Sequence, residues 1–344
     1  MKAKPRLGFL GLGWIGLHRM QAVTASGIAD VTAIADVSAE ALQKAAEIHP
    51  AAHCCRTLDQ LLTHDLDGVV IATPSALHAE QAIAALDRKI AVFCQKPLGR
   101  NAAEVSQMIE SARRSDVLLG VDLSYRFTNG IRAIRDAVQS HELGQIYAAD
   151  LVFHNAYGPD KKWFYDPKLS GGGCLIDLGT HLVDLALWMV QSPVTEVTGR
   201  LFAKGMPLAS APHPAIEDYA TAQIHFASGA TARIACSWNL NAGCDALIEA
   251  TFYGNQGGAS FKNVNGSFYD FHAALFHGTS SQVLSEPPEE WGPRALLDWS
   301  CRLASGARFD SAIREAVEVA RILDSIYRAR SEEHTSELQS PNCI

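Results

Sequence analysis

The sequence LGFLGLGWIG, residues 7–16, decides the fold of the first half of the chain. An apolar run leads into three glycines at GxGxxG spacing, namely Gly11, Gly13 and Gly16, and a helical pattern follows over residues 15–26. Glycines at this spacing allow a tight turn, close approach of the backbone to a pyrophosphate, and close packing of the helix on the strand. The first N–H groups of that helix, around Trp14 and Ile15, are free donors for the same phosphates. The stretch therefore predicts a strand, a phosphate-binding turn and a helix.

An acidic residue, Asp36, ends the next apolar run, 20 positions after Gly16. A carboxylate at this place can accept hydrogen bonds from the ribose hydroxyls of adenosine and repels a 2′-phosphate. No Arg or Lys follows it until Lys44, so the sequence favours NAD over NADP. The alternative is that Asp36 caps the helix that starts near Ser38.

The first 122 residues alternate short apolar runs with longer helical patterns. The expected strands are 7–10, 31–36, 68–72, 91–94 and 117–122, and the expected helices are 15–26, 38–48, 78–86 and 102–115. Strands this apolar are typical of a parallel sheet covered by helices on both faces. We therefore predict an α/β fold with an N-terminal Rossmann domain, a doubly wound parallel sheet, over residues 1–122.

The rhythm changes after residue 122, where strand patterns become dominant. We expect helices at 130–140, 179–190 and 310–327, and strands at 146–155, 194–202, 219–226, 231–238, 247–253 and 267–271. Turn residues such as SGA and GNQGG separate these strands. Residues 123–329 are thus predicted to form an α+β domain with a large open, mostly antiparallel sheet.

The last segment, RSEEHTSELQSPNCI at 330–344, is polar and aperiodic. Its first eleven residues are similar to the translation of a sequencing-adapter oligonucleotide, so we expect a non-native tail and exclude it from the fold. A native acidic tail is the alternative.

The bulk composition limits the classes of function. A chain of 344 residues exceeds what one core usually organises, which predicts two domains with a cleft between them. The net charge of −8 comes without a basic run, so nucleic acid is not an expected partner. We expect no membrane segment, because no uncharged apolar run reaches about 18–20 residues. The eight cysteines lack metal-ligand spacing, which predicts no metal site and reduced thiols in the cytoplasm.

Four motifs make the chain resemble the Gfo/Idh/MocA family of oxidoreductases over about residues 5–329. They are GLGWIGLHR at 11–19, ATPSALHAE at 72–80, CQKPLGR at 94–100 and GGGCLIDLGTHLVDLALWM at 171–189. The resemblance implies an NAD-dependent oxidoreductase that transfers hydride between the nicotinamide ring and a sugar, cyclitol or related polyol. It also implies a homodimer or homotetramer in which the C-terminal sheets pair face to face.

The family places the lysine of a Glu-Lys-Pro turn beside the nicotinamide and the substrate, and the matching residue here is Lys96. An ammonium group there stabilises the alkoxide that develops during hydride transfer. The preceding glutamate is replaced by Gln95. This departure removes a carboxylate that could tune the lysine, so an altered pKa of Lys96 or weaker catalysis is expected.

Asp177 and His181 lie four residues apart, which on a helix puts both side chains on one face. A histidine with an ordinary pKa near 6.5 suits the removal of a hydroxyl proton at neutral pH. The resemblance assigns His181 as acid/base, with Asp177 orienting its imidazole or relaying its proton. Asp184, one turn further on, is expected to be a packing or capping acid.

Five further residues are expected near the ligands. Thr73 and Pro74 end a strand at the carboxyl edge where open α/β sheets bind ligands, and the family uses this turn to contact the dinucleotide. His78 either contacts the cofactor or caps its helix. Arg126 either holds substrate or forms an interdomain ion pair, and Trp163 is expected to line the substrate pocket because aromatic faces suit sugar rings.

Two other functions remain open at this point. One is an NAD-dependent glycosidase of the same family, which releases sugar without net NADH. The other is a non-catalytic NAD-binding sensor, which the replacement at Gln95 makes conceivable.

Overall fold

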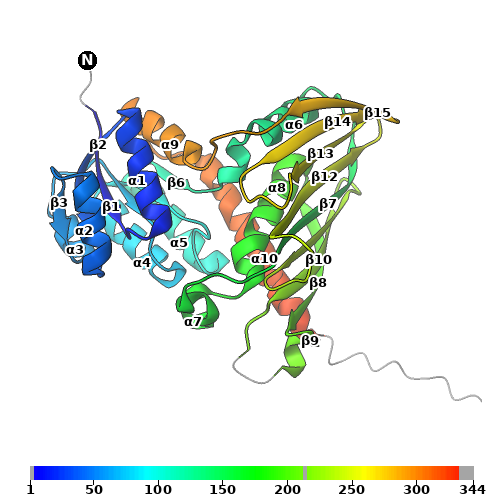
Figure 1. Ribbon diagram of the computed structural model, residues 1–344, viewed down its shortest axis with the longest axis horizontal. Coiled ribbons are helices and arrows are strands. Elements are labelled where there is room, and N and C mark those ends of the chain that lie inside the picture. Colours follow the sequence, from blue (N-terminus) through cyan, green and yellow to red (C-terminus); the bar gives the residue numbers. More distant parts are fainter. Residues whose placement is uncertain (1–3, 212–214, 333–344) are drawn as a thin grey trace, which may run out of the picture.

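Two sheets organise the protein, which is known here from a computed structural model that describes residues 4–211 and 215–332. A six-stranded parallel sheet with helices on both faces forms one half, at the left of Figure 1, and a nine-stranded sheet forms the other half. The architecture is α/β, as predicted.

The first sheet has the strand order β3-β2-β1-β4-β5-β6, and all of its neighbours are parallel. Its strands are β1 (Arg6–Leu10), β2 (Asp30–Ala35), β3 (His53–Cys55), β4 (Gly68–Ile71), β5 (Ala91–Cys94) and β6 (Leu119–Val121). The helices between them are α1 (Trp14–Ser26), α2 (Ala39–Ile48), α3 (Leu58–Leu61), α4 (Ser75–Leu86) and α5 (Ala102–Ser115). The strand order reverses between β1 and β4, so a crevice for a ligand opens at their carboxyl ends.

The second sheet has the order β15-β14-β13-β12-β7-β11-β10-β8-β9. Its strands are β7 (Ile146–Asn155), β8 (Val194–Ala203), β9 (Met206–Pro207), β10 (Tyr219–Phe226), β11 (Thr231–Ser237), β12 (Ala246–Gly254), β13 (Gly258–Asn263), β14 (Phe271–His277) and β15 (Ser280–Ser285). Neighbouring strands are antiparallel except for β7 and β11, which are parallel. The prediction of a mostly antiparallel sheet is confirmed.

One predicted strand, 267–271, is wrong. Residues 264–270 instead form the turn between β13 and β14, where Asn265 and Gly266 have positive φ. The Ser267 hydroxyl accepts hydrogen bonds from the N–H groups of Tyr269 and Asp270. A side chain that binds nearby backbone in this way favours a turn over a strand.

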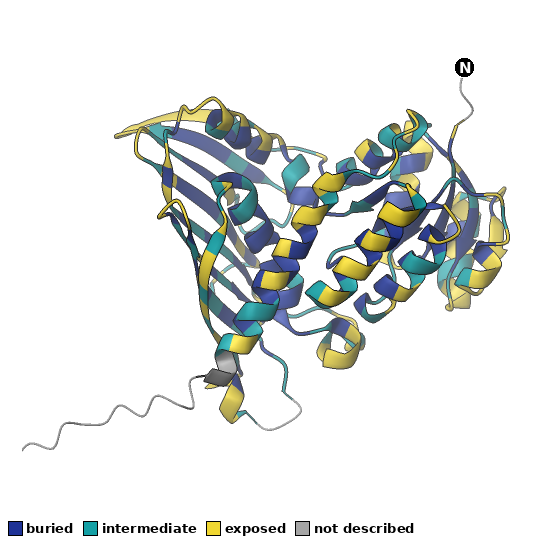
Figure 2. Cartoon of the chain, turned by 180° about the vertical axis from the view of Figure 1, so that it is seen from behind, coloured by how far each residue is buried: buried dark blue, intermediate teal, exposed yellow. Residues whose placement is uncertain are grey.

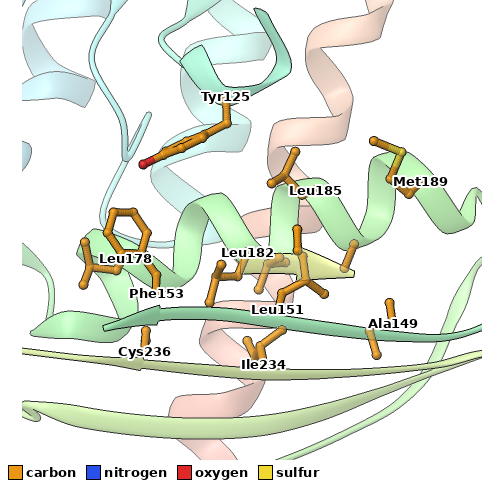
Figure 3. Packing of buried hydrophobic residues seen from close by; sticks show 14 of the residues in the cluster. Tyr125, Ala149, Leu151, Phe153, Leu178, Leu182, Leu185, Met189, Ile234 and Cys236 are labelled. Carbon is orange, nitrogen blue, oxygen red and sulfur yellow. The ribbon is translucent and has the colours of Figure 1, made fainter. Parts of the chain in front are cut away.

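Helices cover one face of the second sheet. They are α6 (Asn129–Gln139), α8 (Thr180–Val190) and α10 (Glu315–Glu332), and the other short elements are α7 (Pro167–Ser170), η1 (Ser124–Phe127), η2 (Lys162–Tyr165), η3 (Leu175–Gly179), η4 (Leu208–Ser210) and η5 (Ser311–Arg314). Figure 3 shows Leu182 on the side of α8 that faces Leu151 of β7, with Tyr125 close to Phe153 and Leu178. Within the described ranges, no helix covers the opposite face.

The last two α-helices of the described chain, α9 (Arg294–Ala304) and α10, contact the two halves of the protein. α9 packs on the first sheet, where the Trp299 ring lies 5.8 Å from that of Phe93. α10 contacts both α5 and β8, and its exposed residues follow its outer side in Figure 2. The predicted closing helix exists, but its regular α part starts at Glu315 after a 3-10 turn, and its backbone continues to Glu332. The rest of the predicted tail, 333–344, lies outside the described residues.

The segment Pro167–Val190 is long enough to cross a membrane and contains an 18-residue stretch with a mean hydropathy of 1.4. However, 78% of that stretch is buried inside the protein, because α8 packs between the second sheet and α10. A helix buried in a protein core has this same composition.

Candidate active site

The glycine turn between β1 and α1 is built for close packing at two positions and is open at the third. Gly11 has φ +88°, and a Cβ there would lie 2.5 Å from the carbonyl oxygen of Ala72. A Cβ at Gly16 would overlap the carbonyl oxygen of Gly11. Nothing lies within 4 Å of the Cβ position of Gly13. The turn therefore leaves free space where a ligand can approach the backbone.

The amino terminus of α1 offers hydrogen-bond donors to this space. The helix has no side-chain cap and no acidic residue in its first turn. No described residue accepts a hydrogen bond from the backbone N–H groups of Gly13, Trp14 or Ile15. Free N–H groups and the positive end of the helix dipole together suit a phosphate. These residues fit the pyrophosphate of a dinucleotide.

Asp36 supports the same turn. Its Oδ2 accepts a hydrogen bond from the N–H of Leu12 at 2.7 Å, and its Oδ1 accepts one from the N–H of Ser38 at 2.7 Å. The cap of α2 is Ser38, whose hydroxyl accepts from the N–H of Ala41. Asp36 thus lies at the end of β2 beside the glycine turn. The residue that caps α2 is Ser38 and not Asp36.

A cation near Asp36 was missed in the sequence. The Arg56 guanidinium donates a hydrogen bond to the carbonyl oxygen of Val37 at 3.0 Å, one residue from Asp36. Arg56 follows β3, and the parallel pairing of β3 with β2 brings it there. Reasoning from residues that directly follow Asp36 cannot find it.

His78 is neither a cap nor free to bind a ligand through its nitrogens. Its Nδ1 lies 2.8 Å from the carbonyl oxygen of Pro97, and its Nε2 lies 2.8 Å from that of Thr73. Burial lowers the pKa of His78 below its usual 6.5, although both carbonyl groups oppose this shift. The ring holds together the turns that follow β4 and β5. Thr73 also donates a hydrogen bond to Gln81 at 2.6 Å, and Pro74 directly precedes α4.

Lys96 projects from the turn after β5 and meets Asp177 from the second half of the chain. Its Nζ lies 2.6 Å from Oδ1 of Asp177 and 2.8 Å from the carbonyl oxygen of the same residue. The indole N–H of Trp238 donates to the other carboxylate oxygen at 3.2 Å. The side chains of Lys96 and Asp177 remain 21% and 14% exposed, so the pair is reachable.

The expected pairing of Asp177 with His181 is not formed. Residues Leu175–Gly179 form a π-helical turn instead of a regular α turn, and such turns are wider. The carboxylate of Asp177 is instead taken by Lys96 and Trp238. None of the described residues hydrogen-bonds the imidazole of His181.

His181 is held by aromatic packing. It is 7% exposed, and its ring lies 4.9 Å from that of Tyr125 and 6.4 Å from that of Phe153. Burial lowers the pKa of His181 well below 6.5, and the positive charge of Lys96 lowers it further. The imidazole is therefore neutral at pH 7 and has a lone pair available to accept a proton.

Gln95 is hydrogen-bonded to Asp122, a carboxylate that a glutamate at position 95 would repel. Its amide donates a hydrogen bond to Oδ2 of Asp122, and Nε of Arg19 donates to the same oxygen at 2.8 Å. Arg19 and Asp122 are only 6% and 1% exposed. A carboxylate at position 95 would face Asp122 at close range, whereas the amide of Gln95 complements it. The sequence did not reveal this contact because its members are far apart in the chain.

Arg126 is not placed to hold substrate, so that prediction is wrong. Its guanidinium binds Asp184 in a bidentate pair, at 2.6 and 2.9 Å, and Glu315 at 2.8 Å. Burial would lower the pKa of Arg126, but the two carboxylates outweigh it and raise the pKa. The residue does not line the cavity that contains His181. Arg126 does form an ion pair, but both carboxylates belong to the second half of the chain, so the pair is not interdomain. Asp184, expected to be a packing or capping acid, is the buried partner of Arg126.

Two cavities meet at the lysine. A large one of about 870 Å³ contains Lys96, His181, Asp122 and Tyr125. A smaller one of about 260 Å³ is lined by Thr73, His78, Asp177 and Trp163, which stacks on Phe164. Both share Ile15, Gln95 and Lys96. Trp163 thus lies near Lys96, but on the side of the smaller cavity. In residues 4–211 and 215–332 no three His, Cys, Asp or Glu side chains gather as metal ligands would.

Residues from both halves of the chain line the cavity that contains Lys96 and His181, and Ile15 of the glycine motif lies at it. A fold that presents a dinucleotide site to a lysine and a neutral histidine defines the class of two-domain, dinucleotide-dependent oxidoreductases. Residues 6–123 match the oxidoreductase family with an NAD-binding Rossmann fold, and residues 131–260 match the GFO/IDH/MocA C-terminal domain. The chain belongs to the Gfo/Idh/MocA family, as the four motifs predicted.

Several curated proteins are similar to this chain. The myo-inositol 2-dehydrogenase of Thermotoga maritima is 28% identical over 262 residues, which are 75% of this chain and 75% of that protein. The D-glucoside 3-dehydrogenase of Escherichia coli is 29% identical over 210 residues, 58% of this chain and 60% of that one.

Solved structures share the whole fold. Levoglucosan dehydrogenase in complex with NADH matches with a TM-score of 0.83 and 21% identity, over 96% of this chain and 98% of that one. A 3-ketoreductase from Actinomadura kijaniata, in complex with NADP and TDP-benzene, matches with a TM-score of 0.80 and 18% identity, over 95% and 98%.

Proposed function

We propose that the protein is an NAD-dependent dehydrogenase that oxidises a CH–OH group of a sugar, cyclitol or related polyol. The observation that carries this proposal is the meeting of Lys96 and the neutral His181 in one cavity that reaches the glycine turn at Ile15. The named relatives, an inositol dehydrogenase and a glucoside dehydrogenase, support the substrate class.

The geometry supports a simple division of roles. The bound oxidised dinucleotide supplies the acceptor for a hydride. His181 takes the proton of the substrate hydroxyl, and Lys96 stabilises the alkoxide oxygen while the hydride leaves the same carbon. Asp177 holds the Lys96 ammonium, since it binds Nζ with both a carboxylate and a carbonyl oxygen. Reduction of a ketone uses the same groups in reverse, with His181 returning the proton.

The preference for NAD is part of the proposal. The carboxylate of Asp36 at the end of β2 supports it by repelling a 2′-phosphate. The guanidinium of Arg56 binds the carbonyl oxygen of Val37, next to Asp36, and its positive charge favours the 2′-phosphate of NADP. The preference for NAD over NADP therefore depends on the balance between the charges of Asp36 and Arg56.

The sensor alternative loses its basis in Gln95, because Lys96 has a carboxylate partner in Asp177. The glycosidase alternative has no separate observation in its favour. We therefore propose net oxidation. A glycosidase would release sugar without net NADH, and an assay for released reducing sugar, run beside the absorbance measurement, would detect it.

We also propose that the chain forms a homodimer or homotetramer through the uncovered face of the second sheet. Leu247 and Tyr253 on that face are 41% and 39% exposed, next to the cross-strand pair of Arg233 and Asp150. Light scattering on the purified protein measures its oligomeric state, and the Tyr253→Glu variant should dissociate the oligomer. A monomeric unmodified protein would refute this proposal.

The function is tested with a panel of sugars, cyclitols and polyols in the presence of NAD or NADP, following the absorbance of the reduced cofactor. We expect NADH formation with at least one member of the panel. The Lys96→Ala and His181→Ala variants should lose this turnover, whereas Lys162→Ala, a surface lysine that lines neither cavity, should keep it. Full turnover by the first two variants would reject the assigned roles.

A further inference from the structure

The large cavity extends well beyond the reactive groups. One wall is a face of α1 that includes Trp14, His18, Ala22 and Ala25. From Trp14 to Ala25 there are eleven residue steps, or about 16 Å along the helix axis. A single pyranose ring is shorter than this. The volume of about 870 Å³ is in the range of pockets that enclose a drug-sized ligand, which leaves room for more than one sugar ring beside the nicotinamide of the proposed function.

The opposite wall is aromatic and held in place. It consists of Phe268 and Tyr269 in the turn between β13 and β14, and of Glu290 and Trp291 after β15. The Trp291 indole donates a hydrogen bond to the carbonyl oxygen of Tyr269 at 2.9 Å, which fixes this turn. We call the groove between α1 and these residues the α1 groove.

Aromatic side chains in the α1 groove are unusually exposed. Trp14 is 63% exposed and Tyr269 is 54% exposed. Tyr157, 52% exposed, packs beside Phe268 with 6.0 Å between ring centroids. Exposed large apolar groups that gather at a cavity indicate a binding surface. Flat aromatic faces suit a second ring with an apolar face, either a sugar or an aryl group.

The charges of the α1 groove do not favour an anion. The two cations that line it are neutralised, Arg19 by Asp122 and Lys96 by Asp177. Burial and the charge of Arg19 lower the pKa of His18, so its imidazole is neutral at pH 7. Glu290 has no ion-pair partner among the described residues. A phosphate or carboxylate in this groove would therefore meet a negative charge and no free cation.

We propose that the substrate is an uncharged glycoside with two rings. Its reacting sugar lies at Lys96 and His181, and its second ring lies in the α1 groove between Trp14 and Tyr269. This inference rests on the proposed function and adds the substrate class to it. It excludes sugar phosphates and nucleotide sugars as preferred substrates.

The test compares kcat/KM for glucose, myo-inositol, methyl glucoside, cellobiose, phenyl glucoside and glucose 6-phosphate. We expect a two-ring glycoside to exceed the single-ring compounds by about tenfold, the effect of one aromatic contact of roughly 1.4 kcal/mol. Cellobiose and phenyl glucoside distinguish a sugar from an aryl second ring. Equal values for single-ring and two-ring compounds, or a preference for the phosphate, would overturn the inference and leave the proposed function intact.

A binding measurement tests the second-ring site independently of catalytic activity. Calorimetric titration of the NAD-saturated His181→Ala variant compares phenyl glucoside and cellobiose with methyl glucoside. Tighter binding of either two-ring ligand supports the α1 groove even when no compound of the panel is oxidised, and equal or weaker binding of both overturns it.

One variant locates the second ring. Tyr269→Ala should lower kcat/KM about tenfold for the preferred two-ring glycoside and less than about twofold for methyl glucoside. Tyr147→Ala is the matched control, because Tyr147 is 56% exposed but lies on β7 outside the cavity. An equal loss on both substrates in Tyr269→Ala would overturn the placement of the ring.

Discussion

Two ion pairs lie close to Gln95, and they differ in exposure. Lys96 and Asp177 join the two halves of the chain and keep 21% and 14% exposed side chains, whereas Arg19 and Asp122 both belong to the first half and keep 6% and 1%. An ammonium that remains accessible can meet a substrate oxygen, but a sealed guanidinium can only neutralise its partner. Lys96, Arg19 and Asp122 all line the large cavity, so the exposed fraction of the side chains separates the pair proposed for chemistry from the pair that holds the wall.

The largest expected effect is on the accessible pair. Lys96→Met should lower kcat/KM by about 10²–10³-fold, because one preorganised donor to the developing alkoxide is lost. Its effect on the free energy of unfolding should be small, since Asp177 stays partly solvated and keeps the Trp238 contact. Steady-state kinetics and urea denaturation measure both quantities. A loss of less than about threefold in kcat/KM would contradict the comparison.

The sealed pair should respond in the opposite way. Asp122→Leu leaves the Arg19 guanidinium buried without its carboxylate and should lower the free energy of unfolding by about 3–5 kcal/mol. Asp177→Leu is the control at the accessible pair and should cost clearly less stability. Urea denaturation curves of both variants measure the difference. Equal destabilisation by the two substitutions would remove the distinction between the pairs.

The pH dependence sharpens the role of His181. Its pKa in the folded protein lies well below 6.5, so the base is already unprotonated at neutral pH. The kcat/KM for oxidation should therefore be flat near pH 7 and fall up to tenfold per unit only below the ordinary histidine range. The neutral buried ring also contributes stability that is present above pH 6.5 and is lost as the pH falls below it. An acid limb centred at or above pH 6.5 that belongs to His181 would contradict this assignment.

The smallest effect is expected at the far end of the dinucleotide site. Asp36→Ser removes the repelling carboxylate next to Arg56 and should raise the ratio of NADP to NAD use by about tenfold, or roughly 1.4 kcal/mol. Adding Arg56→Ala should reverse part of this gain. Binding of the two dinucleotides, measured by calorimetry, is the readout. An unchanged ratio would show that neither charge faces the adenosine ribose.

Most of the regular elements were predictable from the sequence. The strands of the first sheet are apolar runs between helical patterns, and β7, β10, β11 and β12 alternate along their length. β3 and α3 were missed because three and four residues are too short for a period to appear. α9 was missed because its mainly polar sequence hides a few buried residues, among them Trp299.

The sequence predicted which residues lie at the site better than it predicted which of them contact each other. Lys96, Asp177 and His181 do converge on adjoining cavities, yet the partner of Asp177 is Lys96 and not His181. Helical spacing assumes a regular α turn, and the π turn at Leu175–Gly179 breaks that assumption. Arg126 could not be assigned because its two partners are 58 and 189 residues away. Sequence separation of this size carries no local signal.

The packing of α9 has a consequence for how the protein is made. The ring of Trp299 fills the space beside Gly68 and Gly120, where a Cβ would lie within 3 Å of it. Ribosomes deliver the chain from its amino end, and early domains usually fold as they emerge. Here the first core cannot close until residues 294–304 have left the exit tunnel, by which time the whole second sheet has been synthesised. The first core thus depends on a helix encoded after the second sheet, and both halves also wait for α10, which packs on α5 and on β8.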